Sequence, residues 1–178
     1  VTNYSYFLSE STYSGELPPR RLLVLDEAHN VEDEVRRWTS VEVSETDADA
    51  LGEDLDDARR DPVAWLTKTY KPAIERKLAA TGVKLKKFVK SGAMGTTMVR
   101  TLANDNDTQD KRLCQINRIV EKGGELLVSW HEDPVKHKRS VKFQPIDVTA
   151  LVAETLLSRS SATLLMSATL LDRQVFCN

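Results

Sequence analysis

A short apolar run near the start of the chain is followed at once by two carboxylates and a histidine. The run covers residues 22–25 in "LLVLDEAHN", and Asp26, Glu27 and His29 come directly after it. An aspartate at a strand end can hold Mg²⁺, largely through water, because this ion dehydrates reluctantly. The adjacent Glu27 can orient or deprotonate an attacking water, and His29 can pass the state of the site to a neighbouring element. The pattern therefore indicates metal-assisted phosphoryl transfer.

A second polar motif follows another apolar run near the end of the chain. Residues 161–166 read "SATLLM", and Ser167, Ala168 and Thr169 come next. In open α/β sheets, catalytic groups lie just beyond the carboxyl ends of the strands, where both motifs are expected to stand. Taken alone, an Asp-Glu pair is also explained as a helix cap, and Ser and Thr are common at strand ends. The two motifs together, in this order, predict one site.

The apolar patterns predict the elements that must position these residues. Continuous runs at residues 22–25 and 161–166 are typical of strands buried on both faces of one parallel sheet. Two helices are expected, one over residues 31–38 and one after Asp147. The Asp147 carboxylate would cap the second helix. Residues 125–146 are expected to form two strands of a β-hairpin. The ends of the chain therefore predict an α/β fold.

Charge is unevenly distributed along the middle of the chain, although the net charge is only −2. Residues 42–61 contain nine acidic and two basic residues, with a helix cap expected at Ser44 or Thr46. Residues 68–122 contain thirteen basic and five acidic residues, a net charge of +8. Helix breaks are expected at Pro62, Gly82, residues 92–95 and residues 104–110. The first candidates for contacts with nucleic-acid phosphates are Lys84, Lys86, Lys87 and Lys90. A solvated helix face explains these lysines equally well.

Aromatic side chains that could stack on bases occupy apolar positions of the expected elements, which favours packing in the core. These are Trp65, Tyr70, Phe88 and Trp130. His131 and His137 flank the expected hairpin turn and are expected to be exposed.

The composition, 40% hydrophobic and 29% charged, is typical of a globular protein. Cys114 and Cys177 form no metal-binding motif, and two unpaired thiols suggest a reducing compartment. No apolar run reaches the length of a membrane span, and no signal peptide is recognisable. We therefore expect an intracellular location, cytoplasmic or nuclear, and no contact with a membrane.

The two motifs resemble those of a known family. "LLVLDEAHN" resembles the DEAH box of superfamily-two helicases, and "LLMSATL" resembles their third motif. The long insertion between them is similar to that of the XPD/DinG group of iron–sulfur helicases, in which the Arch domain lies between these motifs. "TNYSYFL" resembles the segment that follows the iron–sulfur domain, and residues 141–172 resemble the return from the Arch.

This resemblance implies an ATP-dependent DNA helicase of the repair type that moves 5′ to 3′. Asp26 would bind Mg²⁺, Glu27 would activate water, and His29, Ser167, Ala168 and Thr169 would couple hydrolysis to movement. The implied fold is a RecA-like parallel-sheet portion with an inserted, mainly helical Arch subdomain and a β-hairpin. Residues 1–40 and 146–178 would belong to the first motor domain, and residues 41–145 to the Arch. The Arch would contact single-stranded DNA and could also contact a protein partner.

Parts of such a helicase are missing from the sequence. No Gly-rich phosphate loop occurs, and the four cysteine ligands expected for the iron–sulfur cluster of the intact parent are absent. We therefore expect the chain to be a piece of the enzyme and to be inactive alone, since phosphoryl transfer depends on positioning and charge stabilisation. One alternative is a non-catalytic module that binds protein or single-stranded DNA. Another is a nuclease or other Mg²⁺ enzyme that uses Asp26 and Glu27.

Overall fold

The computed structural model describes residues 2–14, 17–91, 97–122, 124–134 and 138–167. The chain divides into two compact units. Unit 1 comprises Val1–Thr39, Lys122–Glu125 and Pro145–Asn178, and unit 2 comprises Ser40–Glu121 and Leu126–Gln144. The two main divisions, after Thr39 and after Gln144, each lie one residue before the boundary expected from the sequence. No helix among the described residues is both long enough and apolar enough to cross a membrane.

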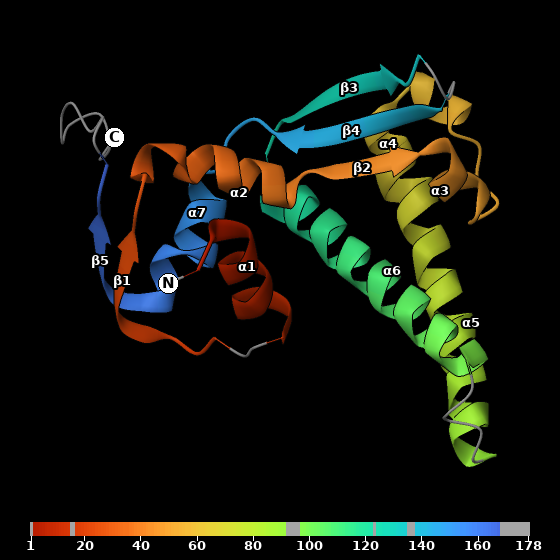
Figure 1. Ribbon diagram of the computed structural model, residues 1–178. Helices are drawn as coiled ribbons and strands as arrows, with labels where there is room; N and C mark the ends of the chain where they lie inside the picture. Colours follow the sequence, from red (N-terminus) through yellow and green to blue (C-terminus); the bar gives the residue numbers. More distant parts are fainter. Residues whose placement is uncertain (1, 15–16, 92–96, 123, 135–137, 168–178) are drawn as a thin grey trace. The chain divides into compact units, whose positions relative to one another are not determined.

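Unit 1 contains a parallel pair of strands, as the two apolar runs predicted. They are β1 (Arg20–Leu25) and β5 (Ser160–Leu165), which lie side by side in Figure 1. Leu25 is paired with Leu165, so both strands end at the same edge of the sheet. The helices of unit 1 are α1 (Tyr4–Ser9), α2 (Val31–Thr39) and α7 (Thr149–Thr155), with short turns η1 (Glu10–Ser14), η2 (Ala28–Asn30) and η5 (Leu157–Arg159). The cap position of α7 is Val148, one residue later than expected, and Asp147 Oδ1 accepts the N–H of Thr149 at 2.8 Å from just outside the helix.

The expectation that both strands are buried on both faces is wrong. Leu25 is buried and Leu23 packs against the core of unit 1, with Leu8 and Val35 from the helices. Alternate residues point to the other face of a strand, and there Leu22, Val24 and Leu164 are 56%, 48% and 49% exposed. Among the described residues, the apolar core of unit 1 covers one face of this sheet only.

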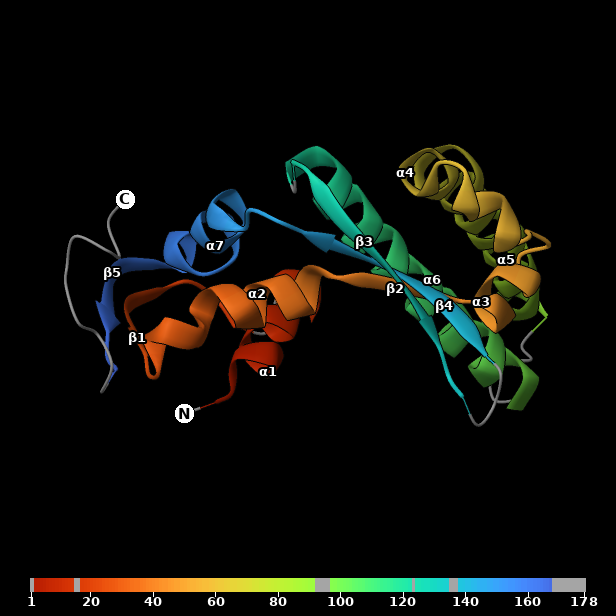
Figure 2. The same cartoon turned by 90° about the horizontal axis from the view of Figure 1, so that it is seen from above.

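Unit 2 is built on a three-stranded sheet in the order β2-β4-β3, which Figure 2 shows passing over α6. The strands are β2 (Val41–Ser44), β3 (Leu126–Glu132) and β4 (Arg139–Pro145). The two strands of the hairpin, β3 and β4, were predicted, but β2 was not. It pairs antiparallel with β4, and its buried Val41 and Val43 lie opposite Phe143 and Val141. The alternation of buried and exposed residues covers only four positions and was missed because the acidic composition begins at Glu42.

In the sequence, the helices of unit 2 follow β2 and precede β3. They are α3 (Glu45–Asp49), α4 (Pro62–Trp65), α5 (Lys71–Lys90) and α6 (Thr97–Lys122), with turns η3 (Asp56–Arg59) and η4 (Leu66–Tyr70). Ser44 caps α3 as predicted, because its hydroxyl accepts the N–H of Asp47 and the Asp47 carboxylate bonds back to the N–H of Ser44. Asp61 caps α4 through the N–H of Ala64, so the expected break at Pro62 is confirmed as a helix start.

Two other expected helix breaks are wrong. Gly82 lies inside α5, and residues 104–110 lie inside α6. A glycine costs only about 1 kcal/mol in a helix, which the packing of a 20-residue helix outweighs. In α6, Asp105 pairs with Lys77 and Asp107 with Lys111, so both carboxylates of the polar run have cationic partners on a helix. The expected break at residues 92–95 lies outside the described residues.

The core of unit 2 joins the sheet to α4, α5 and α6. Trp65 and Tyr70 are buried and stack with ring centroids 5.1 Å apart, which confirms the expected core packing. Phe88 is half-buried near the end of α5. The expectation for Trp130 is wrong, because its side chain is 37% exposed, with the Arg59 guanidinium 5.1 Å from the ring centroid. The core residues contributed by α6 and β4 include Ile116, Ile119, Val141 and Phe143.

A partly buried ionic network ties α3 to α6 and η4. Arg112 donates to the hydroxyl of Tyr70 at 2.8 Å, and its guanidinium lies 3.1 Å from Asp47 Oδ1. Burial raises the pKa of Tyr70 to about 12, so the phenol stays protonated at neutral pH. Partial burial alone would raise the pKa of Asp47, but hydrogen bonds from Arg112 and Ser44 outweigh it and hold that pKa below its ordinary value.

We expect unit 2 to lose stability in acid because of Asp47. A carboxylate whose pKa is lowered by folding adds its full stabilisation above its unfolded-state pKa, 3.8 here, and loses it as the pH falls through the lower folded-state value. Urea unfolding followed by circular dichroism from pH 7 to about pH 3 measures this dependence. Asp47→Asn should flatten it, whereas Asp107→Asn, which removes an exposed carboxylate of α6, should not. Equal pH dependence in both variants and the wild type would contradict this role.

Candidate functional site

The first expected motif forms a tight turn at the carboxyl end of β1. Asp26 and Glu27 follow the last strand residue and precede η2. Glu27 has φ 50° and ψ 46°, a left-handed conformation that few non-glycine residues adopt. Its N–H donates to Asp26 Oδ1 at 3.0 Å, which orients the Asp26 carboxylate. Both side chains are exposed, so a ligand can reach them from solvent.

Pairing between the two strands continues one step past their ends. The N–H of Met166 donates to the carbonyl of Leu25 at 2.9 Å, and the N–H of Ala28 donates to the carbonyl of Met166 at 2.9 Å. These bonds place Ser167, the first residue of the second motif, beside the first motif. The structure therefore brings together two segments that are separated by 138 residues.

His29 connects the carboxylate of the first motif to the hydroxyl of the second. Its Nδ1 lies 2.6 Å from Ser167 Oγ and 3.3 Å from Glu27 Oε2. A proton on Nδ1 can be donated to either oxygen, and an unprotonated Nδ1 can accept from the Ser167 hydroxyl. A change in the charge or position of the Glu27 carboxylate can therefore alter the bond between His29 and Ser167. Movement of Ser167 can likewise alter the contact between His29 and Glu27.

Tyr4 belongs to this site although sequence reasoning did not single it out. Its hydroxyl donates to the main-chain carbonyl of Asp26 at 2.6 Å. Partial burial raises the pKa of Tyr4, and the negative charges of Asp26, Glu34 and Glu27 raise it further, so the hydroxyl remains a donor at neutral pH. The sequence contains no local signal for this contact, because the two residues are 22 positions apart and lie in different elements.

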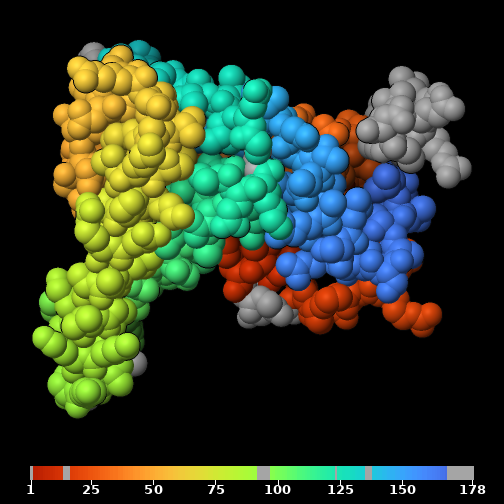
Figure 3. All heavy atoms as spheres, turned by 180° about the vertical axis from the view of Figure 1, so that it is seen from behind, coloured from red at the N-terminus to blue at the C-terminus, as the bar shows by residue number. Residues whose placement is uncertain are grey.

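Four of the predicted site residues of unit 1 are therefore neighbours: Asp26, Glu27, His29 and Ser167. Ala168 and Thr169 lie outside the described residues. The predicted lysines belong to unit 2, where Lys84, Lys86, Lys87 and Lys90 are all exposed on the last turns of α5. We call these four the α5 lysine face. In Figure 3, seen from behind, this end of α5 extends away from the rest of unit 2.

The surroundings of the α5 lysine face are basic and partly apolar. No acidic residue occurs in the sequence between Glu75 and Asp105. Val83 and Val89, on the same helix, are 55% and 54% exposed. The face therefore offers positive charge without a neighbouring carboxylate on its own helix, which favours contact with anions.

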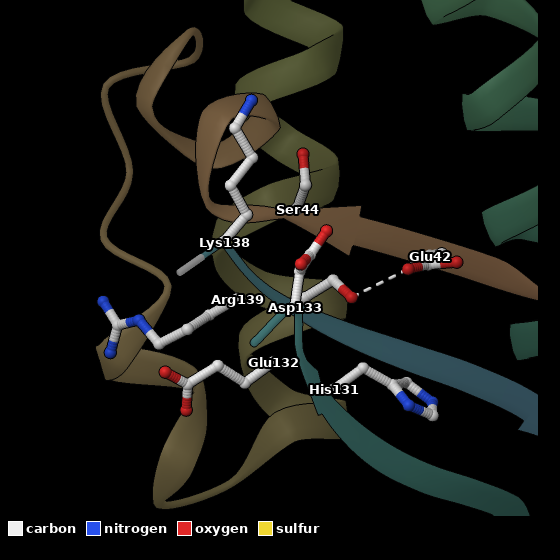
Figure 4. A pocket seen from close by; sticks show the side chains of 8 residues that line it. Glu42, Ser44, His131, Glu132, Asp133, Lys138 and Arg139 are labelled. Carbon is white, nitrogen blue, oxygen red and sulfur yellow. Dashed lines mark hydrogen bonds between the residues drawn. The ribbon is translucent and has the colours of Figure 1, made fainter. Parts of the chain in front are cut away.

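A hollow of about 450 Å³ lies on the strand ends of unit 2. Figure 4 shows acidic and basic side chains around it, and Ser140 donates to Glu42 at 2.7 Å. Arg139 is engaged by Glu45 and Asp56, which hold its pKa above its ordinary range. His131 is exposed as expected, and His137 lies outside the described residues. The lining residues are Glu42, Ser44, His131, Glu132, Asp133, Lys138, Arg139 and Ser140. They suggest no specific chemistry.

Comparisons of the sequence with protein-family models and with curated proteins find no match. Function is therefore inferred from the residues themselves and from their geometry. Two features support that inference, the joined strand ends of unit 1 and the α5 lysine face of unit 2.

Proposed function

We propose that this chain carries the DEAH box and the third motif of an ATP-dependent DNA helicase of the iron–sulfur type, which moves 5′ to 3′. The observation that carries the proposal is the 2.6 Å contact between His29 Nδ1 and Ser167 Oγ at the adjacent ends of two parallel strands. Helix capping does not explain these residues, because η2 begins without a side-chain cap, and capping gives no reason for a histidine to meet the second motif. A device that couples hydrolysis to movement requires such a connection.

In this proposal each residue has a defined chemical role. Glu27 orients or deprotonates the water that attacks the terminal phosphate of ATP. His29 couples Glu27 to Ser167, because its Nδ1 lies within contact distance of both side chains. The residues after Ser167 would transmit the change to the DNA path, as the resemblance to the third motif implies.

The residues at the strand end fit a bound Mg²⁺. Asp26 offers an exposed carboxylate oriented by the N–H of Glu27, and Mg²⁺ commonly takes one or two carboxylates and fills its other positions with water and phosphate oxygens. The ion would neutralise charge that develops on the phosphates. Among residues that the structure describes, no group of three or more His, Cys, Asp or Glu side chains is placed to hold a metal.

Unit 2 corresponds in this proposal to the inserted Arch domain, and its α5 lysine face contacts single-stranded DNA. Support comes from the exposure of all four lysines and from the acid-free stretch around them. Lysines that neutralise phosphates release bound counterions, so the affinity depends steeply on salt. A non-catalytic module that binds single-stranded DNA would show the same dependence, and a module that binds protein would not.

Removing three of these lysines is expected to weaken binding of single-stranded DNA. In Lys86→Gln/Lys87→Gln/Lys90→Gln, the slope of log affinity against log salt should fall in magnitude by about 2, since each phosphate contact contributes about 0.7. Fluorescence anisotropy with a labelled oligonucleotide at several salt concentrations measures this slope.

The matched control removes three exposed lysines elsewhere in unit 2, at Lys68, Lys111 and Lys138. Both triple variants change the net charge equally. If the slope falls in the first variant and not in the control, the DNA contacts the α5 lysine face. Equal losses would indicate a nonspecific charge effect. Absence of binding by the wild-type chain at low salt would instead favour a protein-docking role for unit 2.

A further inference from the structure

The backbone of the Asp26–Glu27 turn is held in an unfavourable conformation. Among the described residues, Glu27 is the non-glycine residue with positive φ. A side chain in the left-handed region crowds the following carbonyl, and such conformations persist only where the surroundings enforce them. The contacts that enforce this one therefore matter for the placement of the Glu27 and Asp26 carboxylates.

Three of these contacts are local or come from the neighbouring strand. Glu27 N–H donates to Asp26 Oδ1, the carbonyl of Glu27 accepts the N–H of Asn30 at 2.9 Å, and Ala28 N–H donates to Met166. The contact from a separate helix is the 2.6 Å hydrogen bond from the Tyr4 hydroxyl to the Asp26 carbonyl. It acts on the peptide group between Asp26 and Glu27, which is the group whose rotation would release the left-handed conformation.

Tyr4 is itself placed firmly enough to act in this way. Asn3 caps α1, with its Oδ1 accepting the N–H of Tyr6 at 2.7 Å. Leu8, one turn along the same helix, is fully buried in the core of unit 1, and the Tyr4 ring packs against that core. The hydroxyl therefore sits at the end of a ring whose position is determined by packing.

We propose that Tyr4 is a positioning residue of this site, whose hydroxyl holds the Asp26–Glu27 peptide so that both carboxylates face the ligand in a single arrangement. The consequence for metal and water chemistry rests on the proposed function. The consequence for the turn itself does not.

The test compares Tyr4→Phe with Tyr6→Phe in the full chain. Tyr4→Phe keeps the ring and removes only the hydroxyl, whereas Tyr6 is 50% exposed on the same helix and serves as the matched control. Amide hydrogen exchange followed by NMR should be about threefold to tenfold faster at Ala28 and Asn30 in Tyr4→Phe, which corresponds to the loss of one hydrogen bond. The amide of Val35, buried in α2, should be unchanged. No change at Ala28, or an equal change at Val35, would overturn the proposal.

A second readout separates positioning from a purely structural role. Titration with Mn²⁺ alone, a paramagnetic substitute for Mg²⁺, should broaden the amide signals of Glu27 and Ala28 in the wild type and in Tyr6→Phe. In Tyr4→Phe we expect the apparent affinity to fall about threefold or more, because the Asp26 carboxylate loses its fixed orientation. Wild-type affinity in Tyr4→Phe would overturn the positioning role. Absence of broadening in the wild type would count against the proposed function, while the exchange measurement would still decide whether Tyr4 holds the turn.

Discussion

Replacing Glu27 with glutamine is expected to lower the rate of ATP hydrolysis by about 10²- to 10⁴-fold in the helicase of which we propose this chain is a part. The substitution keeps the size of the side chain and removes the carboxylate that would accept a proton from the attacking water. Binding of single-stranded DNA should be retained, because the α5 lysine face lies in unit 2. Steady-state ATP hydrolysis with single-stranded DNA measures the effect.

Glu32→Gln is the matched control for this prediction. Glu32 lies in the first turn of α2, its side chain is 71% exposed, and it makes only a 4.0 Å ion pair with Arg36. Its loss should change hydrolysis by less than about twofold, since exposed ion pairs contribute little. Hydrolysis that survives Glu27→Gln at the control rate would rule out Glu27 as the general base and would favour a non-catalytic binding module.

The second large effect is expected in the core of unit 2. Phe143→Ala should lower the free energy of unfolding by about 3–5 kcal/mol, because truncating a buried phenylalanine removes apolar contacts and leaves a cavity. Phe143 is fully buried at the centre of the sheet, where β4 faces Ile116 and Ile119 of α6. Urea unfolding followed by tryptophan fluorescence is a suitable measurement, since Trp65 lies in the same core.

Val83→Ala tests whether that loss is specific to the core. Val83 is 55% exposed on α5, so its truncation should change the free energy of unfolding by less than about 1 kcal/mol. A similar small change in Phe143→Ala would mean that the sheet and α6 do not form a single cooperative core. The same comparison tests the pairing of the unexpected strand β2, because Phe143 lies opposite Val41.

Local patterns were sufficient for most elements of the chain. The continuous apolar runs predicted β1 and β5, the residues after β1 predicted α2, and Ser44 predicted the start of α3. These predictions succeed because strand propensity, helical spacing and capping depend on neighbours within a few positions. The position of Asp26 at a strand end followed from the same signals.

Predictions that depended on what surrounds an element were less successful. Gly82 did not break α5, Trp130 lies partly exposed beneath Arg59, and the outer face of β1 is not covered by the described residues. Each outcome is determined by long-range packing, which no window of neighbouring residues encodes. The strand β2 was missed for a related reason, since four residues form a strand only when β4 supplies their hydrogen-bond partners.

The residues at the two strand ends can be identified from local sequence, because apolar runs stop where polar residues begin. The contact of His29 with Ser167 and the hydrogen bond of Tyr4 to the carbonyl of Asp26 follow from long-range packing instead. Both contacts depend on the register that places Leu25 opposite Leu165 and on the packing of α1 in the core of unit 1. A shift of one residue in that register would point Ser167 to the other face of the sheet and separate it from His29, since neighbouring side chains alternate between faces.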